Sequence, residues 1–187
     1  MIYIILGVIA YLFFFLYDIN SVLIRSKLLK PCFFAGILLQ AASTVGIVIS
    51  SAEQIRPNLI RTSICGVLAV LFFFLLIYTL FFALPFEATY MEDEAPRQVY
   101  RNGFYALCRH PGVLMFIAMY LFMGLALHLW LFYVASAVFC SLNLLYVLFQ
   151  DRWTFMRIFP DYGQYKQETP FLLPDRSSIT KCIQTIS

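Results

Sequence analysis

The chain has 187 residues, of which 62% are hydrophobic and only 12% charged, whereas soluble domains are roughly 45–50% apolar and about 25% charged. A soluble domain this short could not bury so many apolar side chains, and their long runs differ from the alternating pattern of a porin-type barrel. The net charge of +3 does not favour a nucleic-acid partner. We therefore expect an all-α, multi-pass membrane protein.

Five apolar stretches approach the length of about 20 residues that a membrane-spanning helix needs. In chain order they are Ile2–Tyr17, Cys32–Ser50, Ser63–Leu84, Gly112–Leu127 and Leu129–Phe149. The first lacks a basic n-region and an A-x-A cleavage site, so we expect a retained helix and not a signal peptide. The last two are separated only by His128 and are together far too long for one crossing, which predicts a tight helical hairpin.

The basic residues agree with five crossings and an outside N-terminus. Three segments then face the cytosol and hold 11 of the 13 Lys and Arg residues, which are Arg25, Lys27, Lys30, Arg97, Arg101, Arg109, Arg152, Arg157, Lys166, Arg176 and Lys181. Cytosolic loops of membrane proteins are enriched in such residues. A four-crossing alternative would place the two C-terminal polar segments on opposite faces and split their basic residues.

The densest polar signal is the stretch 103–111, which ends in Arg109-His110-Pro111. Pro111 suits the first turn of a helix, and a helix N-terminus favours anions. Arg109 can grip a carboxylate in a bidentate way, and His110 can donate, accept or carry a proton near neutral pH. The alternative is a basic flank that anchors the helix at the lipid headgroups.

A second polar segment, residues 150–174, follows the predicted hairpin. Its Asp151 is costly directly after a spanning helix unless it is paired or solvated. Asp151 could hold a ligand ammonium or hydroxyl group, or it could form a salt bridge with Arg152 or Arg109. We interpret Tyr162 and Tyr165 as part of an interfacial aromatic belt.

The remaining features are less informative. The five cysteines contain no C-x-x-C pair and the two histidines do not cluster, so we expect no metal site. Residues 175–187 are expected to form a short, polar and frayed tail.

Taken together, the two polar segments resemble the isoprenylcysteine carboxyl methyltransferase family and its phospholipid methyltransferase relatives. The family pattern is G-x-Y-x-x-x-R-H-P before a helix, an acidic residue after the hairpin, then F-(G/P)-x-x-Y and a closing P-x-x-x-P. The residues that correspond to this pattern are Gly103, Tyr105, Arg109, His110, Pro111, Asp151, Phe159, Pro160, Tyr162, Tyr165, Pro170 and Pro174, with Tyr162 one residue earlier than F-(G/P)-x-x-Y requires. Val113, Met115 and Arg152 depart from it, since the family often has Tyr, Gly and Glu there.

The resemblance implies a single membrane-embedded, methyltransferase-like domain over residues 1–174, with the motifs in 86–174. It implies S-adenosylmethionine as the cofactor, bound at the cytosolic face, and a lipophilic or lipidated acceptor that arrives from the membrane lipid. The residues that it assigns to the cofactor are Arg97, Gln98, Val99, Tyr100, Tyr105, His110 and Asp151. Arg109 would be the catalytic residue that guides an acceptor carboxylate.

Two other functions are compatible with the sequence. Membrane reductases of the steroid 5α-reductase type carry a similar Arg-His-Pro and use NADPH. A non-catalytic scaffold with a degenerate site is the second alternative, and the three departures favour it.

The hairpin makes a geometric prediction. Two antiparallel legs of roughly 18–20 residues return the chain to its starting depth. We therefore expect His110 and Asp151 to lie on the same membrane face and to line one cavity, with Tyr105 nearby.

Overall fold

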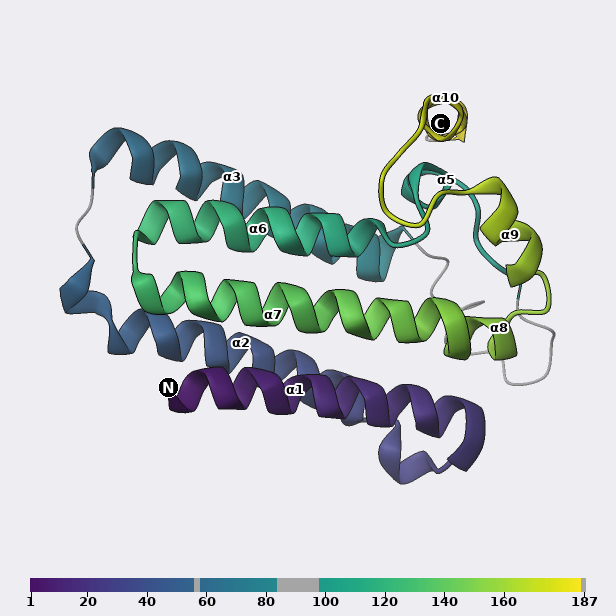
Figure 1. Cartoon of the computed structure of the whole chain (residues 1–187), viewed down its shortest axis with the longest axis horizontal. Helices are drawn as coiled ribbons and strands as arrows, with labels where there is room; N and C mark the ends of the chain where they lie inside the picture. The colour runs from purple at the N-terminus through teal and green to yellow at the C-terminus, as the bar shows by residue number, and fades with distance from the viewer. Residues whose placement is uncertain (56–57, 84–97, 186–187) are drawn as a thin grey trace.

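The computed structural model describes residues 1–55, 58–83 and 98–185, and every regular element in these residues is helical (Figure 1). Five long helices lie side by side, namely α1 (Ile2–Ile19), α2 (Cys32–Ser50), α3 (Leu59–Ile77), α6 (Pro111–Leu127) and α7 (Trp130–Phe149). Wider π-helical turns extend three of them, and these are η1 (Asn20–Ile24), η4 (Tyr78–Phe82) and η5 (Gln150–Thr154).

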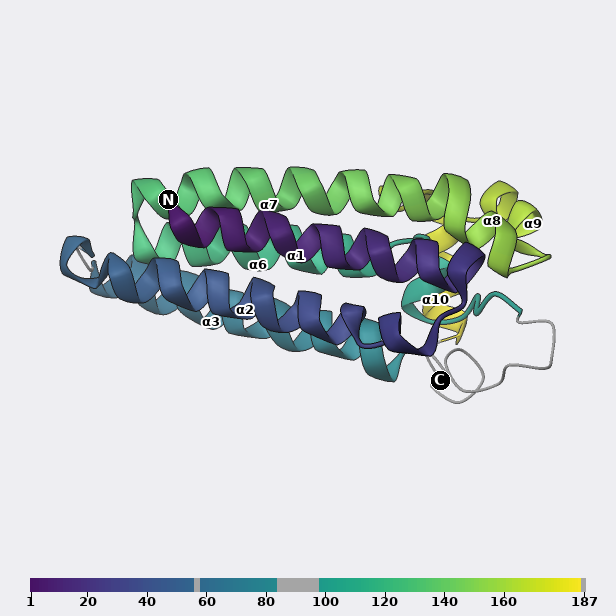
Figure 2. The same ribbon diagram turned by 90° about the horizontal axis from the view of Figure 1, so that it is seen from below.

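Four of these helical segments are long and apolar enough to cross a membrane, namely Ile2–Ile24, Lys27–Ser50, Leu59–Phe82 and Trp130–Ile158. Helix α6 is shorter, at 17 residues, but it is equally apolar and runs beside α3 and α7 (Figures 1 and 2). Outward-facing side chains such as Leu38, Val67 and Leu121 are more than half exposed, as lipid contact requires. The all-α, polytopic membrane fold is thus confirmed.

The predicted hairpin between α6 and α7 is also present. His128 adopts a left-handed backbone, with φ 52° and ψ 44°, and its N–H bonds back to the carbonyl of Gly124. This ends α6 without the usual glycine, which is why the sequence marked the turn so weakly. Helix α3 begins at Leu59, four residues earlier than predicted, because the Asn58 side chain caps it by accepting from the Arg61 N–H.

The helices pair in a way that leaves an internal space. Helix α1 packs along α2 and α3 along α6, and α7 contacts both α1 and α6, which joins the two pairs (Figure 2). Gly36 permits the close approach of α1 and α2, since a Cβ there would lie 2.6 Å from the Phe14 ring and 3.1 Å from the Ala10 carbonyl oxygen. Tyr11 donates a hydrogen bond to the Phe139 carbonyl at 3.0 Å and ties α1 to α7.

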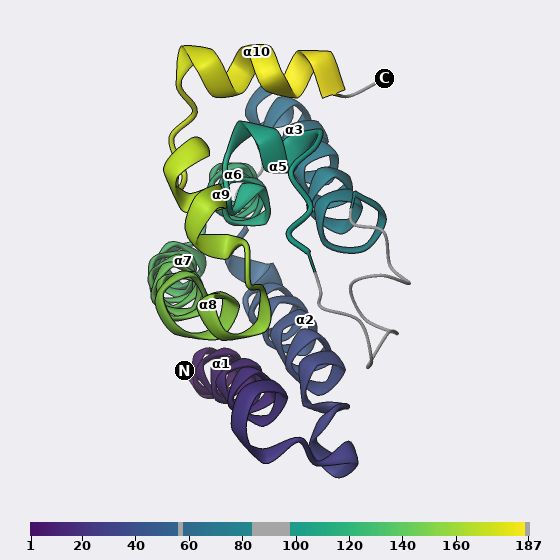
Figure 3. The same cartoon turned by 90° about the vertical axis from the view of Figure 1, so that its right-hand side faces the viewer.

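One end of the bundle carries the polar motifs, and we call residues 98–110 and 150–174 the motif end (Figure 3). Its short helices are α5 (Phe104–Leu107), α8 (Phe155–Ile158) and α9 (Tyr162–Glu168). That this end faces the cytosol, with the N-terminus outside, stays a prediction.

The expectation of a frayed tail is wrong. Residues Arg176–Thr185 form helix α10, which packs against α5 (Figure 3). The Asp175 carboxylate accepts the Ser178 N–H at 2.8 Å and so begins the helix, as an N-cap does. The Thr185 hydroxyl accepts the Gly103 N–H at 2.9 Å. Sequence reasoning noted the polar composition of this segment and missed its cap.

Candidate functional site

A buried carboxylate organises the motif end. Asp151 is 4% exposed and lies on η5, directly after α7. Its Oδ1 is 2.8 Å from the Arg109 Nε and accepts the Tyr162 hydroxyl at 2.8 Å. Its Oδ2 is 2.9 Å from the Lys166 Nζ. Two cations and a phenol therefore compensate this one acid, which is how a buried charge is tolerated.

Arg109 joins the hairpin to the tail. Besides Asp151, its guanidinium donates from Nη1 to the Lys166 carbonyl at 3.0 Å and to the Thr169 carbonyl at 2.8 Å, and its backbone N–H donates to the Pro170 carbonyl. With the second contact to Asp151, from Nη2 at 3.4 Å, four of its five N–H groups are used. Of the two roles weighed for Asp151, the structure shows the salt bridge to Arg109.

The interpretation of Tyr162 and Tyr165 as an interfacial belt is wrong, since each is only 2% exposed. Tyr162 donates to Asp151, and Tyr165 donates to the Tyr105 carbonyl at 2.6 Å. Burial raises the pKa of both phenols, so both hydroxyls stay protonated donors. These two tyrosines help to build the site; Tyr162 stands one residue earlier than the pattern F-(G/P)-x-x-Y requires, so the motif was an inexact signal for them.

His110 precedes α6 as its N-cap residue and is 7% exposed. Its ring stacks on Phe155 and meets Phe171 edge-on. Burial lowers the pKa of His110, so the imidazole is neutral near pH 7. Its Nε2 lies 3.5 Å from the Asp151 Oδ1 and has no hydrogen-bond partner among the described residues. Since His110 also lines the cavity, its neutral ring can contact a ligand there.

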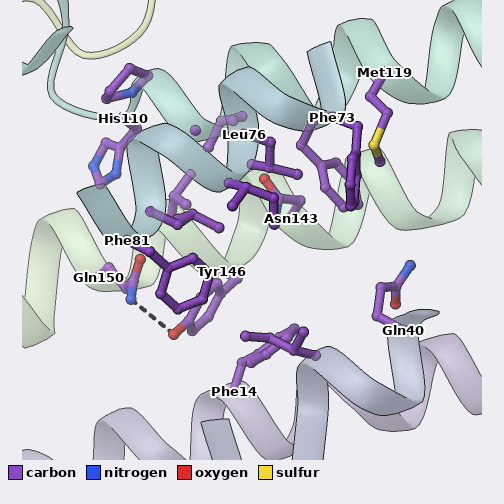
Figure 4. Close-up of a pocket in the computed structure, with 18 of the residues that line it drawn as sticks. Phe14, Gln40, Phe73, Leu76, Phe81, His110, Met119, Asn143, Tyr146 and Gln150 are labelled. Atoms are coloured by element: carbon purple, nitrogen blue, oxygen red, sulfur yellow. Dashed lines mark hydrogen bonds between the residues drawn. The ribbon is translucent and has the colours of Figure 1, made fainter. Parts of the chain in front are cut away.

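One large cavity extends from the motif end into the bundle (Figure 4). It has a volume of about 960 Å³ and lies among α1, α2, α3, α6 and α7. Gln98, Tyr100, Tyr105 and His110 line its polar part, whereas its inner wall is mainly apolar and includes Phe14, Phe73, Leu76 and Met119. The cavity is thus amphipathic, with polar side chains such as Gln40 and Asn143 also set into its mainly apolar inner wall.

The prediction that His110 and Asp151 share one end of the bundle is confirmed. The expectation that both line the cavity is half wrong, because His110 and Tyr105 line it while Asp151 lies behind them in its ion-pair cluster. The hairpin legs bring the residues together as predicted. Arg109 itself lines the cavity and pairs with the Asp151 carboxylate, which is not part of the lining.

The stretch before α5 also reaches the cavity. Val99 lines it, but its N–H donates to the Asp161 carboxylate at 3.1 Å, so this amide holds the loop in place. Tyr100 and Tyr105 meet edge-to-face, and the Tyr105 hydroxyl donates to the Thr79 carbonyl at 2.9 Å. Arg97 lies outside the described residues.

The three departures from the family pattern have different surroundings. Val113 is buried and lines the cavity, so a smaller side chain than Tyr enlarges the space there. Met115 is buried within the bundle and is not on the cavity wall. Arg152 is exposed, and its charge does not enter the Asp151 cluster.

Sequence reasoning missed the cavity residues of the first two helices, which it treated as generic spans. These polar lining residues are Asp18, Ser21, Gln40 and Thr44. Asp18 had a usable signal, because a carboxylate within an otherwise apolar spanning helix is a candidate functional residue.

Comparisons with known proteins add no assignment: no family model matches the chain, and neither a curated protein nor a solved structure does.

Proposed function

We propose that this chain is an S-adenosylmethionine-dependent methyltransferase of the membrane that acts on a lipophilic acceptor. The observation that carries the proposal is the amphipathic cavity. Its polar part, at His110 and Tyr105, suits a charged cofactor, and its apolar wall between the helix pairs suits an acceptor from the bilayer.

The size of the cavity is compatible with two ligands. Small-molecule sites are roughly 300–1,000 Å³ in volume, and about 960 Å³ lies at the upper limit of that range. Room for a cofactor and part of a lipid chain is what a transfer reaction between them needs.

The residues at the polar part fit the cofactor chemically. Aromatic faces attract cations such as a sulfonium, and Tyr100 and Tyr105 supply two rings on the cavity wall. The Nε2 of His110 lies 3.5 Å from the Asp151 Oδ1, and the neutral His110 ring forms part of the cavity wall. When bound, S-adenosylmethionine supplies an activated methyl group; these side chains would bind it, orient it and exclude water.

Within this proposal Arg109 is a positioning residue. Four of its N–H groups hold Asp151 and the carbonyls of Lys166 and Thr169. It therefore fixes the loop that carries His110, and it has little capacity left to grip an acceptor carboxylate.

A thermal-shift experiment on detergent-purified protein separates the two enzyme classes, because only a ligand that binds the native state stabilises it. S-adenosylhomocysteine is expected to raise the midpoint of unfolding in a concentration-dependent way, and NADPH is expected to leave it unchanged. Stabilisation by NADPH alone would favour the reductase, and stabilisation by neither at millimolar concentration would favour the non-catalytic scaffold.

A further inference from the structure

Asp18 is a second buried carboxylate near the same end of the bundle. It lies near the end of α1, is 3% exposed and lines the cavity beside Gln150 and Tyr146, whose hydrogen bond Figure 4 shows. Its Oδ2 has no hydrogen-bond partner among the described residues. The side chains of Gln150, Tyr146 and Thr154 are close enough to interact with the Asp18 carboxyl group, so the acceptor left without a donor among the described residues is the Oδ2 atom.

In the part of the chain that the structure describes, no Lys or Arg pairs with Asp18. Among the described residues that line the cavity, Asp18 is the only acid and Arg109 the only Lys or Arg. Arg109 is already held by Asp151. A buried carboxylate without a cation is costly in a low-dielectric interior, so a cationic ligand placed there would gain both the ion pair and the hydrogen bond.

Two further acceptors face the same space. The Gln40 Oε1 and the Asn143 Oδ1 also lack partners among the described residues, and both side chains line the cavity (Figure 4). The Gln40 amide nitrogen already donates to the Tyr120 hydroxyl at 2.9 Å, which leaves the oxygen for a ligand. The cavity therefore offers acceptors to a ligand that carries several N–H groups.

We propose that Asp18 forms the anionic subsite of this cavity and binds an alkylammonium group. The ammonium would donate to the Asp18 Oδ2, and its hydrocarbon chain would lie along the apolar wall near Phe14 and Phe73. This inference rests on the proposed function, because we assign the ammonium group to the lipophilic acceptor of the methyl transfer. A carboxylate acceptor would be repelled by the same charge.

The binding test uses dodecylamine, dodecanol and dodecanoate as probes of equal chain length, in a nonionic maltoside detergent at pH 7.5. An alkylamine is cationic at that pH, since its pKa is about 10. Dodecylammonium is expected to raise the midpoint of unfolding at concentrations where dodecanol and dodecanoate do not. Equal stabilisation by dodecanoate would overturn the proposal.

Two variants assign the effect to a residue. Asp18→Asn keeps the shape and removes the charge, and it is expected to weaken the apparent dodecylammonium affinity about tenfold or more. Glu53→Gln is the matched control, because Glu53 is exposed and lies outside the cavity lining; it should bind like the unmodified chain. Equal affinity of Asp18→Asn and the unmodified chain would overturn the proposal. If Asp18→Asn fails to fold, the proposal is judged by the unmodified chain alone: stabilisation by dodecylammonium and not by dodecanol or dodecanoate supports it, and equal stabilisation by dodecanoate overturns it.

The source of the ammonium group is found in a separate titration with S-adenosylhomocysteine. If Asp18→Asn binds it as the unmodified chain does, the subsite takes the amine of the acceptor. If Asp18→Asn loses it and dodecylamine competes with it, the subsite takes the ammonium of the cofactor. Both outcomes support an alkylammonium subsite. If S-adenosylhomocysteine does not bind at all while dodecylammonium does, the proposed function fails and the subsite stands.

Discussion

The bundle holds two buried carboxylates near one end, and their surroundings are opposite. Asp151, in the C-terminal half, is held by Arg109, Lys166 and Tyr162 and lies behind the cavity wall. Asp18, in the first helix, lines the cavity and has an oxygen without a hydrogen-bond partner among the described residues.

The two sets of surroundings imply two roles, one in stabilising the fold and one in binding a ligand. A carboxylate surrounded by cations fixes its neighbours and has nothing left for a ligand. A carboxylate that faces a cavity without a cation leaves the protein less stable and the site more receptive. Asp151 therefore stabilises the site from behind the wall, motif residues such as Tyr105 and His110 line the cavity, and residues outside the motifs supply part of its inner surface.

The largest expected effect is at Asp151. Replacement by Ala leaves Arg109 and Lys166 buried or half-buried without their acid, and we expect it to lower the free energy of unfolding by about 3–5 kcal/mol. Chemical denaturation in detergent measures the loss. Glu168→Gln is the control, because Glu168 pairs with Arg101 at an exposed position and should cost less than about 1 kcal/mol. Equal losses would mean that the cluster is no more important than a surface pair.

The hydroxyl of Tyr162 is the next largest contributor to the cluster. Tyr162→Phe removes only the donor to the Asp151 Oδ1, and hydrogen bonds to charged groups contribute about 1.5–3 kcal/mol. Tyr165→Phe removes an equally buried hydroxyl that donates to a neutral carbonyl, for which about 0.5–1.5 kcal/mol is expected. The same denaturation experiment compares them, and a larger loss at Tyr165 would contradict the central place given to Asp151.

Asp18→Asn should act in the opposite direction. Removing a buried carboxylate that no described cation pairs with is expected to raise the ligand-free stability by about 0.5–2 kcal/mol, as often happens when a functional residue is replaced. The midpoint of thermal unfolding without ligand is the measurement. A destabilisation like that of Asp151→Ala would show that Asp18 has a structural partner and is not held ready for a ligand.

The smallest effect concerns pH. The pKa of buried His110 lies below its ordinary value, which is about 6.5. The unfolded chain therefore takes up a proton before the folded chain does as the pH falls below 6.5. This lowers the free energy of unfolding by up to about 1.4 kcal/mol between pH 7.5 and 5.5.

That loss should disappear in His110→Asn and persist in His128→Asn, where the histidine is exposed. Asn suits both controls, because it tolerates the left-handed backbone of His128. The measurement is the difference in unfolding midpoint between the two pH values for each variant. An unchanged pH dependence in His110→Asn would show that His110 is not the group that titrates.

The fold was predictable because lipid-spanning helices are long and apolar, and because a hairpin is the only way to fit residues 112–149 into one bilayer. The ends of the helices were less predictable, since they depend on single side chains. The Asn58 cap lengthens α3, and the left-handed turn at His128 has neither Gly nor Pro to mark it.

The candidate site was predictable only in part. The spacing in the sequence predicted that His110 and Asp151 lie at the same end of the bundle, because they flank the hairpin, and the structure places their Nε2 and Oδ1 atoms 3.5 Å apart. It did not show which of them faces the cavity, since that depends on where Lys166 and Tyr162 fold back. The contribution of Asp18 depends on the packing of α1 beside α7, and the motifs of the C-terminal half carry no information on that contact.

Calorimetric titration of the detergent-purified protein with S-adenosylhomocysteine tests the central claim most directly. We expect heat of binding at a single site, with an affinity about tenfold weaker in Tyr100→Ala, which removes the packing area of an aromatic ring from the cavity wall. Tyr133→Ala, at a tyrosine outside the cavity lining, should bind as the unmodified chain does. No binding at millimolar S-adenosylhomocysteine, or an equal loss in both variants, would contradict a cofactor site in this cavity.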